Sequence, residues 1–171
     1  MQVDVWSDIV CPWCLEGKRA FDEALAAFEH RDELEVTWHS FELDPGARTS
    51  FAAHRLLHHA AARGRQGELV ERLLRAHFDE GEPIGDREVL MRLAGDAGLG
   101  AGEVRVTLAS GRYAAEVRRD EALAQRLGIE AVPYFLLARR FGIAGAQPAG
   151  ALLEGLRRAY SGDGGGGAAA A

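Results

Sequence analysis

Hydrophobic and polar positions alternate in two different ways near the start of the chain. The first six residues alternate apolar and polar side chains, which predicts a short strand. From Pro12 to Phe28 apolar residues recur at helical spacing, and proline suits the first helical turn because its missing N–H would be unbonded there anyway. A second strand-like run covers residues 34–43 and stops at the turn sequence Asp44-Pro45-Gly46. The predicted order so far is strand, helix, strand.

The pattern changes between Thr49 and Gly128, where apolar residues repeat at helical spacing through several segments. Glycine-containing breaks separate these segments, and Asp86 has the residue type expected of a helix N-cap. Gly128 has the type expected directly after the last helix of the stretch. The whole stretch is therefore predicted to be a block of helices.

Two strands and a helix are predicted for the rest of the chain. Residues 131–137 form a continuous apolar run of strand length, and residues 141–144 form a second strand beyond Arg139-Arg140. We expect these two strands to form a buried antiparallel pair. A last helix begins at Gln147-Pro148, and residues 161–171 are predicted to be a disordered tail because they contain little to bury.

Composition supports one folded domain over residues 1–160. The chain has 171 residues, of which 47% are hydrophobic and 27% charged, as in ordinary folded proteins. Twenty basic and 26 acidic residues leave a formal net charge of −6 at pH 7. Because this balance provides no basic field for a phosphate backbone, nucleic acid is not an expected partner.

We expect a cytoplasmic protein with no membrane partner. The chain opens without a basic leader or an apolar stretch of signal-peptide length. No window approaches the roughly 20 apolar residues that a membrane-spanning helix requires. In the cytosol thiols are kept reduced, and a disulfide found there is usually transient, catalytic or redox-sensing.

The two cysteines of the chain lie in one four-residue run, Cys11-Pro12-Trp13-Cys14, at the start of the first predicted helix. The helix dipole and the free N–H groups of its first turn stabilise an anion, so the pKa of Cys11 should fall below the free value of about 8.5. Cys14 is close enough along the chain to attack a mixed disulfide formed on Cys11. This spacing predicts a reversible redox pair with a nucleophilic Cys11 and a resolving Cys14.

A structural disulfide and a zinc site are the alternatives. A disulfide across so small a loop removes little entropy from the unfolded chain, and the cytosol would reduce it. Zinc would need two further ligands, and His54 and His58 lie four residues apart but about 40 residues beyond Cys14, outside zinc-finger spacing. We expect neither a metal nor another cofactor. The histidines at positions 54, 58, 59 and 77 are expected to be groove or surface residues of the helical block.

Val132-Pro133 stands at the start of the third predicted strand. Proline is costly inside a strand, and a cis X-Pro bond is typically a deliberate feature of a tight turn. Next to the cysteine pair we favour a cis bond, with the Val132 backbone placed to hydrogen-bond an extended substrate chain. The residues expected to border the substrate are Pro12, Trp13, Val132 and Pro133.

Several motifs together resemble the DsbA family of thioredoxin-fold oxidoreductases, and within it the FrnE-like branch. They span nearly the whole chain apart from the tail: Asp8 to Cys14, Gly17-Lys18-Arg19, Phe41 to Pro45, Ala53 to Leu57, Glu80 to Leu90, Gly128 to Phe135 and Gly145 to Pro148. The resemblance implies an α/β thioredoxin-like fold with an all-helical insertion, about residues 49–127, between the second and third strands as a cap over the site. It also implies that Cys11 attacks, that Cys14 resolves, and that Pro133 is a cis-proline facing them.

Two positions depart from the family pattern. Leu15-Glu16 stands where relatives often carry an aromatic or aliphatic residue followed by a small or apolar one. An inward-facing Glu16 would raise the pKa of Cys11, and we expect it to face solvent. Arg139-Arg140 replaces the usual Asp-Gly or Asn-Gly hairpin turn. This second change affects the expected loop geometry rather than the chemistry.

The function expected from these features is that of a thiol-disulfide oxidoreductase, a dithiol-disulfide oxidase or isomerase that acts on protein or small-molecule thiols and disulfides. Glutathione is a candidate reductant. One alternative is a glutathione-dependent isomerase or transferase of the kappa-class type, which typically has serine at the position of Cys11. Another is a redox-inactive binding module of the same fold. Direction of electron flow and oligomeric state stay open.

Overall fold

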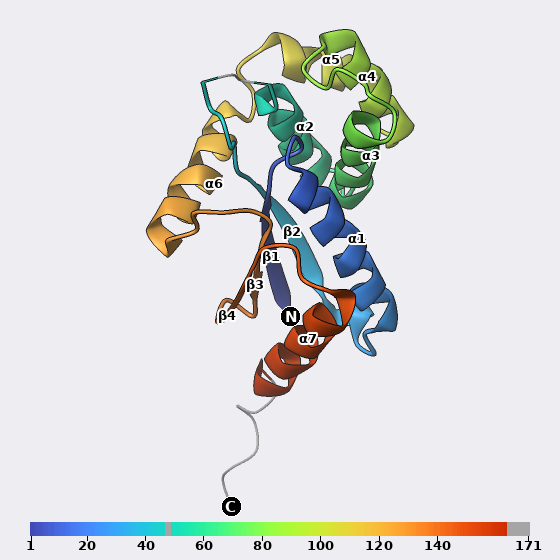
Figure 1. Ribbon diagram of the computed structural model, residues 1–171. Coiled ribbons are helices and arrows are strands. Elements are labelled where there is room, and N and C mark those ends of the chain that lie inside the picture. The colour runs from blue at the N-terminus through green and yellow to red at the C-terminus, as the bar shows by residue number, and fades with distance from the viewer. Residues whose placement is uncertain (47–48, 164–171) are drawn as a thin grey trace, which may run out of the picture.

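A four-stranded sheet forms the centre of the molecule, for which the computed structural model describes residues 1–46 and 49–163 (Figure 1). The strands are β1 (Gln2–Ser7), β2 (Glu35–Ser40), β3 (Tyr134–Leu137) and β4 (Phe141–Ala144), in the spatial order β2-β1-β3-β4. β1 pairs with β2 in parallel and with β3 antiparallel, and β3 pairs antiparallel with β4. The predicted antiparallel pair near the end of the chain is confirmed.

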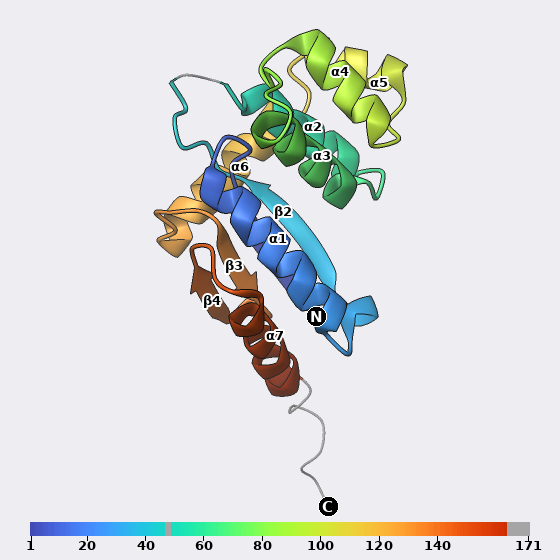
Figure 2. The ribbon, with the colours of Figure 1, turned by 45° about the vertical axis from the view of Figure 1, so that its right-hand side comes forward.

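Helices cover both faces of this sheet. α1 (Pro12–Ala27) and α7 (Ala149–Asp163) pack against each other on one face, whereas α6 (Ala114–Leu127) packs against β2 from the other (Figures 1 and 2). Side chains of β1 alternate between the two faces: Val3 and Val5 join the main core, and Trp6 joins a second cluster with Ala124 of α6. This alternation follows from the two-residue repeat of a strand.

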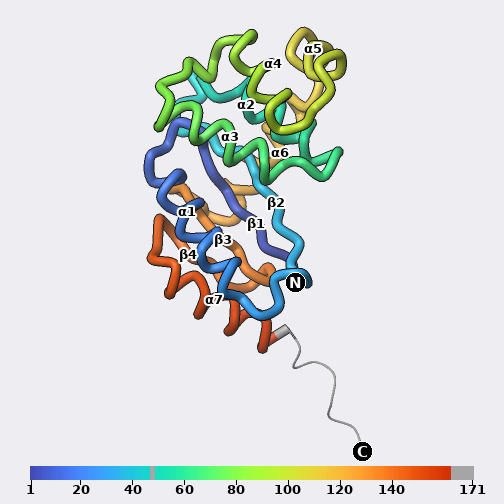
Figure 3. Tube along the Cα trace, turned by 90° about the vertical axis from the view of Figure 1, so that its right-hand side faces the viewer, coloured from blue at the N-terminus to red at the C-terminus, as the bar shows by residue number. Residues whose placement is uncertain are grey.

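The predicted helical insertion between the second and third strands is confirmed. It contains α2 (Phe51–Ala61), α3 (Gln66–Phe78), α4 (Arg87–Asp96) and α5 (Ala101–Ala109), followed by α6. Figure 3 shows α2–α5 stacked on the end of the sheet where β1 leads into α1. The insertion therefore lies next to the start of α1, where the cysteines are.

No helix in the described part of the chain has the length and apolar composition needed to cross a bilayer.

The strands differ from their predicted lengths at two places. The strand predicted over residues 34–43 ends at Ser40, because the chain turns away and the Leu43 N–H donates to the Asp8 carboxylate at 2.8 Å. The strand predicted from residue 131 begins at Tyr134, since Pro133 has no N–H to offer a neighbouring strand. A short 3₁₀ helix, η1 (Arg31–Glu33), also precedes β2.

The β3–β4 turn and the end of α7 also differ from expectation. Ala138 and Arg139, rather than Arg139 and Arg140, occupy the turn centre with φ of 50° and 55°, and both central positions of a type I′ turn require positive φ. α7 continues to Asp163, so the tail predicted from residue 161 begins too early. Extending an existing helix costs little once it is nucleated. The remainder of that predicted tail, residues 164–171, lies outside the described residues.

Candidate active site

Cys11 caps the N-terminus of α1, directly after the loop that leaves β1. Pro12 occupies the first helical position, as predicted, and Trp13 is 66% exposed. Cys11 and Cys14 are free cysteines and only 3% and 1% exposed. The local sequence explains this geometry, because a strand end, a proline-initiated helix and two-residue spacing place both sulfurs on the inner side of the first turn. An approaching disulfide would therefore meet Cys11 beside an exposed aromatic ring.

The pKa of Cys11 is lowered to about 6. The largest cause is a hydrogen bond from the Cys14 thiol, which favours the thiolate and outweighs the burial that opposes it. Backbone N–H groups of Cys14 and Trp13 lower the pKa further, and the negative charge of Asp8 raises it. Cys11 is therefore mostly thiolate at neutral pH, as the helix-start position predicts.

Cys14 is shifted in the opposite direction. Burial raises its pKa, and its hydrogen bond to Cys11 raises it further. The backbone N–H of Asp8 donates to the Cys14 sulfur at 3.5 Å and partly opposes this shift. The pair thus contains one sulfur poised as an anion and one that keeps its proton. Such a division suits attack by Cys11 followed by attack by Cys14.

A turn from the other half of the chain abuts Cys11. The Val132–Pro133 bond is cis, as predicted, and the Val132 carbonyl oxygen lies 3.8 Å from the Cys11 sulfur. The Pro133 carbonyl accepts a hydrogen bond from Gly145 N–H at 2.8 Å, which connects the turn to the chain beyond β4. The four residues predicted to border a substrate are therefore grouped around Cys11: Pro12, Trp13, Val132 and Pro133.

The buried pair Asp8 and His54 adjoins Cys14, whose sulfur accepts the Asp8 N–H. His54 Nε2 is 3.2 Å from Asp8 Oδ1, and both side chains are 1% exposed. Burial raises the pKa of Asp8, but the hydrogen bond and charge of His54, together with hydrogen bonds from the Leu43 N–H and Ser50, lower it by more, so the net shift is downward. His54 was expected in a groove or on the surface, and that prediction is wrong. Its partner is 46 residues away in sequence, which no local pattern reveals.

A second ionic cluster lies on the α6 face of the sheet. His39 is 2.9 Å from both Asp4 and Asp120 and stacks on Trp6 at 4.4 Å between ring centroids. Burial lowers the pKa of His39, but its hydrogen bonds with Asp120 and Asp4 raise it to about 9. Hydrogen bonds with His39, His58 and the Ser40 N–H keep the pKa of Asp120 below its usual range despite burial. This cluster connects α6 to Trp6, which packs in one cluster with both cysteines.

The remaining histidines have partners other than the cysteines. His58 Nε2 lies 3.0 Å from Asp120 Oδ2, and His59 is fully buried with Nδ1 3.0 Å from the Thr107 hydroxyl. The surface position expected for His59 is therefore also wrong. Within residues 1–46 and 49–163, no group of three or more Cys, His, Asp and Glu side chains could hold a metal ion. Glu16 is exposed, as expected.

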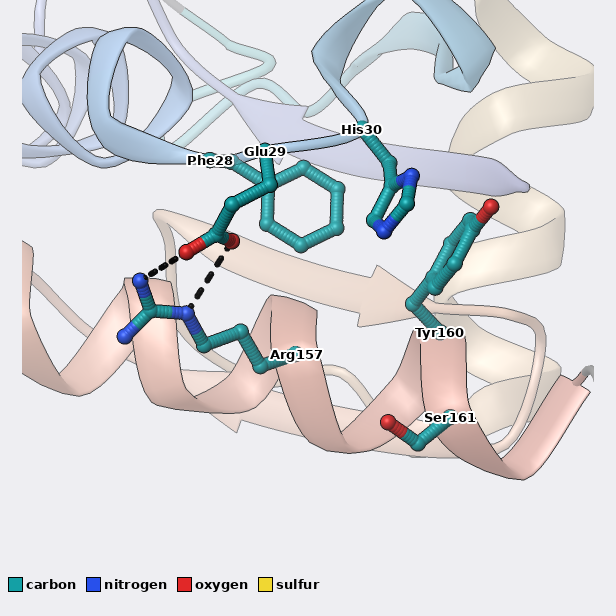
Figure 4. Close-up of a pocket in the computed structure, with 6 residues that line it drawn as sticks. All are labelled: Phe28, Glu29, His30, Arg157, Tyr160 and Ser161. Carbon is teal, nitrogen blue, oxygen red and sulfur yellow. Dashed lines mark hydrogen bonds and ion pairs between the residues drawn. The ribbon is translucent and has the colours of Figure 1, made fainter.

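Two cavities outside the cysteine cluster help to delimit the site. One, of about 290 Å³, lies where α1 ends against α7 and contains an ion pair between Glu29 and Arg157 (Figure 4). It is roughly 24 Å from Cys11 along α1, at about 1.5 Å per helical residue. The other, of about 540 Å³, is lined by Val10, Thr49, His77, Pro83, Ile84, Gly85 and Asp86. Only this second cavity adjoins the cysteine loop, because Val10 precedes Cys11.

Known proteins share this architecture. Residues 2–157 match the family model described as a DSBA-like thioredoxin domain. The crystal structure of a probable DsbA oxidoreductase, SCO1869 from Streptomyces coelicolor, has 38% sequence identity and a TM-score of 0.88, covering 94% of this chain and 90% of that one. The uncharacterized protein YwbO of Bacillus subtilis is 27% identical, over 80% of this chain and 86% of its own.

A more distant structure has the same fold. The cytosolic disulfide reductase DsbM from Pseudomonas aeruginosa, solved with GSH, has 20% identity and a TM-score of 0.69, covering 96% of this chain and 98% of that one. The family match extends over nearly all of the described residues and includes both cysteines and the Val132–Pro133 turn. The chain belongs to the DSBA-like thioredoxin domain family and is a disulfide oxidoreductase.

Proposed function

We propose that this protein is a cytoplasmic thiol-disulfide oxidoreductase in which Cys11 attacks and Cys14 resolves. The observation that carries the proposal is the opposite shift of the two thiols, with the pKa of Cys11 lowered to about 6 and that of Cys14 raised. A pair that only packed in the core would have no reason to hold one sulfur as an anion beside the Val132–Pro133 turn. The assignment to the FrnE-like branch stays a proposal from the sequence motifs.

The exchange proceeds in two balanced steps. The Cys11 thiolate attacks one sulfur of a substrate disulfide, a mixed disulfide forms, and the other substrate sulfur leaves as a thiolate that takes a proton from water. Cys14 then loses its proton and attacks the Cys11 sulfur, which forms the Cys11–Cys14 disulfide and releases the second thiolate. Two electrons pass from the enzyme dithiol to the substrate. Oxidation of a substrate dithiol is the same sequence in reverse.

The substrate chain is proposed to lie between the Val132 turn and Trp13. An extended peptide can add to an exposed backbone segment as a strand would, and the Val132 carbonyl stands beside the attacking sulfur. The exposed Trp13 ring offers an apolar surface on the other side. Pro12 keeps the first turn of α1 in place under the substrate.

Glutathione is the proposed reductant that returns the enzyme to its dithiol form. This choice is supported by DsbM, a protein of similar fold that is described as a cytosolic disulfide reductase and was solved with GSH. One glutathione thiolate would attack the Cys11 sulfur and release Cys14, and a second would then free Cys11 as glutathione disulfide forms. The enzyme thereby gains the two electrons that the two glutathione molecules lose.

A glutathione redox titration tests the proposed roles. Cys14→Ser should accumulate a glutathione adduct on Cys11, detected by mass spectrometry, whereas Cys11→Ser should form none and lose insulin-reducing activity. Wild type should lose two hydrogen atoms, that is two protons and two electrons, on oxidation and regain them with reductant. Absence of the adduct in Cys14→Ser, or insulin reduction by Cys11→Ser, would contradict the assignment. A wild type whose mass is indifferent to reductant would instead favour a redox-inactive module.

A further inference from the structure

The carboxylates of Glu42 and Glu121 share a single cation, the guanidinium of Arg118. Glu42 follows β2 and its side chain is 1% exposed, and Glu121 projects from α6 with a side chain 18% exposed. A single nitrogen, Arg118 Nη1, lies 2.7 Å from Glu42 Oε1 and 2.7 Å from Glu121 Oε2. One charge of this trio is therefore left uncompensated by Arg118.

Each carboxylate also has a second oxygen that no donor reaches. Glu42 Oε2 and Glu121 Oε1 are buried and have no hydrogen-bond partner among the described residues. Burying a carboxylate oxygen without a donor is costly, so such atoms call for an explanation. Burial and the neighbouring Glu121 raise the pKa of Glu42, which is consistent with a proton held between the two acids when nothing else is bound.

These two side chains line a cavity of about 150 Å³. Its other walls are formed by Phe41, Pro45, Gln125 and Ile129. Pockets for whole small molecules usually measure about 300–1,000 Å³, so this one has room for a single side chain rather than a cofactor. A charged acidic end and apolar walls match a lysine or arginine side chain, whose methylene stem is apolar and whose tip is a cationic donor.

The cavity lies beside the buried cluster that contains the reacting sulfurs. Ile129 belongs to the buried cluster that contains Cys11 and Cys14, and Phe41 packs against that cluster. Leu43, next to Glu42, donates its N–H to Asp8, whose own N–H contacts the Cys14 sulfur. A residue adjacent to a cysteine held at Cys11 would therefore lie near this cavity.

We propose that the cavity between Glu42 and Glu121, the acidic subsite, binds the lysine or arginine side chain of a peptide substrate next to its reacting cysteine. The ammonium or guanidinium replaces the proton shared by Glu42 and Glu121. This inference rests on the proposed function and adds a substrate class to it: disulfides of peptides with a basic residue beside the cysteine.

Peptide disulfides that differ in one residue test the subsite. Acetylated, amidated peptides with a single cysteine preceded by Lys, Gln or Glu, joined as disulfide dimers, are reduced by the dithiol enzyme and followed by quenched chromatography. Each rate is divided by the rate with dithiothreitol, because a nearby charge alters the intrinsic reactivity of a disulfide. The normalised Lys-to-Gln ratio should be about tenfold in wild type, with Glu slowest.

Three variants locate the effect. Glu121→Gln should bring the ratio close to one, whereas Glu116→Gln, on the same helix and paired with Arg119 outside the cavity, should leave it unchanged. Arg118→Gln removes the resident cation and should increase the ratio, a change that general loss of structure would not produce. Oxidised glutathione, whose ammonium is next to a carboxylate, should be reduced at similar rates by wild type and Glu121→Gln.

The two hypotheses fail in different ways. A wild-type ratio near one, or a ratio that Glu121→Gln leaves unchanged, would overturn the acidic subsite and leave the proposed function intact, since the Gln peptide is still reduced. Failure of the wild-type enzyme to reduce any of the peptides would overturn both.

Discussion

Gly17 of α1 packs directly against the ring of Pro133. A Cβ atom placed on Gly17 would lie 2.6 Å from Pro133 Cγ, closer than non-bonded carbons can approach, and 3.3 Å from its Cβ. The helix that carries Cys11 and the turn that carries Val132 are thus in contact through a residue with no side chain. This contact sets how near the turn stands to the attacking sulfur.

Gly17→Ala should separate helix and turn. Overpacking a tight contact costs about 1–3 kcal/mol, and we expect unfolding free energy to fall by that amount and the rate of disulfide exchange to fall with it. Chemical denaturation and insulin reduction measure the two effects. Gly95→Ala in α4, where an added Cβ meets nothing within 4 Å, is the matched control and should be neutral or stabilising. If Gly17→Ala and Gly95→Ala had the same effect on unfolding free energy and exchange rate, the contact with Pro133 would not be the cause.

Cys14→Ala should raise the pKa of Cys11 above about 6, because the hydrogen bond from the Cys14 thiol is the largest cause of the low value. Cys14→Ser retains an O–H donor at the same position, so its effect should be smaller. The pH dependence of Cys11 alkylation measures the pKa in each variant. If alanine and serine gave the same pKa, the side-chain hydrogen bond would not be the cause.

Asp8→Asn should lower the pKa of Cys11 further, since the carboxylate of Asp8 opposes the thiolate. The same change removes the charged partner of buried His54, and we expect a loss of about 1–3 kcal/mol in unfolding free energy. Alkylation rates and denaturation provide the two readouts. Asp32→Asn, at a side chain 97% exposed, is the control. A raised pKa of Cys11 in Asp8→Asn would disprove the electrostatic role.

Stability should depend on pH through His39. Its folded pKa of about 9 exceeds the unfolded value of about 6.5, so the folded state binds the proton more tightly. The contribution, of order 3 kcal/mol, is fully present below about pH 6.5 and is lost as pH rises through about 9. Asp4 and Asp120 have lowered pKa values, so their contribution is lost in acid instead.

His39→Gln tests this dependence, because it retains hydrogen-bonding capacity and removes the titrating charge. The thermal stability of wild type should fall from about pH 6.5 to pH 10 more steeply than that of the variant. Parallel curves across this range would show that the His39 charge does not stabilise the fold. Loss of the Trp6–His39 stack would accompany the substitution and is monitored by tryptophan fluorescence.

The order of strands and helices could be predicted because each element depends on neighbours along the chain. The two-residue alternation before Ser7 and the helical spacing after Pro12 are local features, and they place Cys11 at a helix start without reference to the rest of the fold. The Val132–Pro133 turn was predicted from its motif and from the family resemblance. Element ends were less accurate, since tertiary hydrogen bonds such as that from Leu43 to Asp8 decide them.

The sequence by itself determined the reactive pair, since the Cys-x-x-Cys spacing, the strand before it and the helix after it suffice to predict one activated thiol and one resolving thiol. Only the tertiary structure decided what surrounds that pair. Val132 is 121 positions from Cys11, and Arg118 is 76 positions from Glu42. Contacts at such separations depend on how the sheet and the helical insertion pack together. Partners brought together in this way shift the pKa values of Asp8 and His39 against the effect of burial, whereas burial raises the pKa of Glu42.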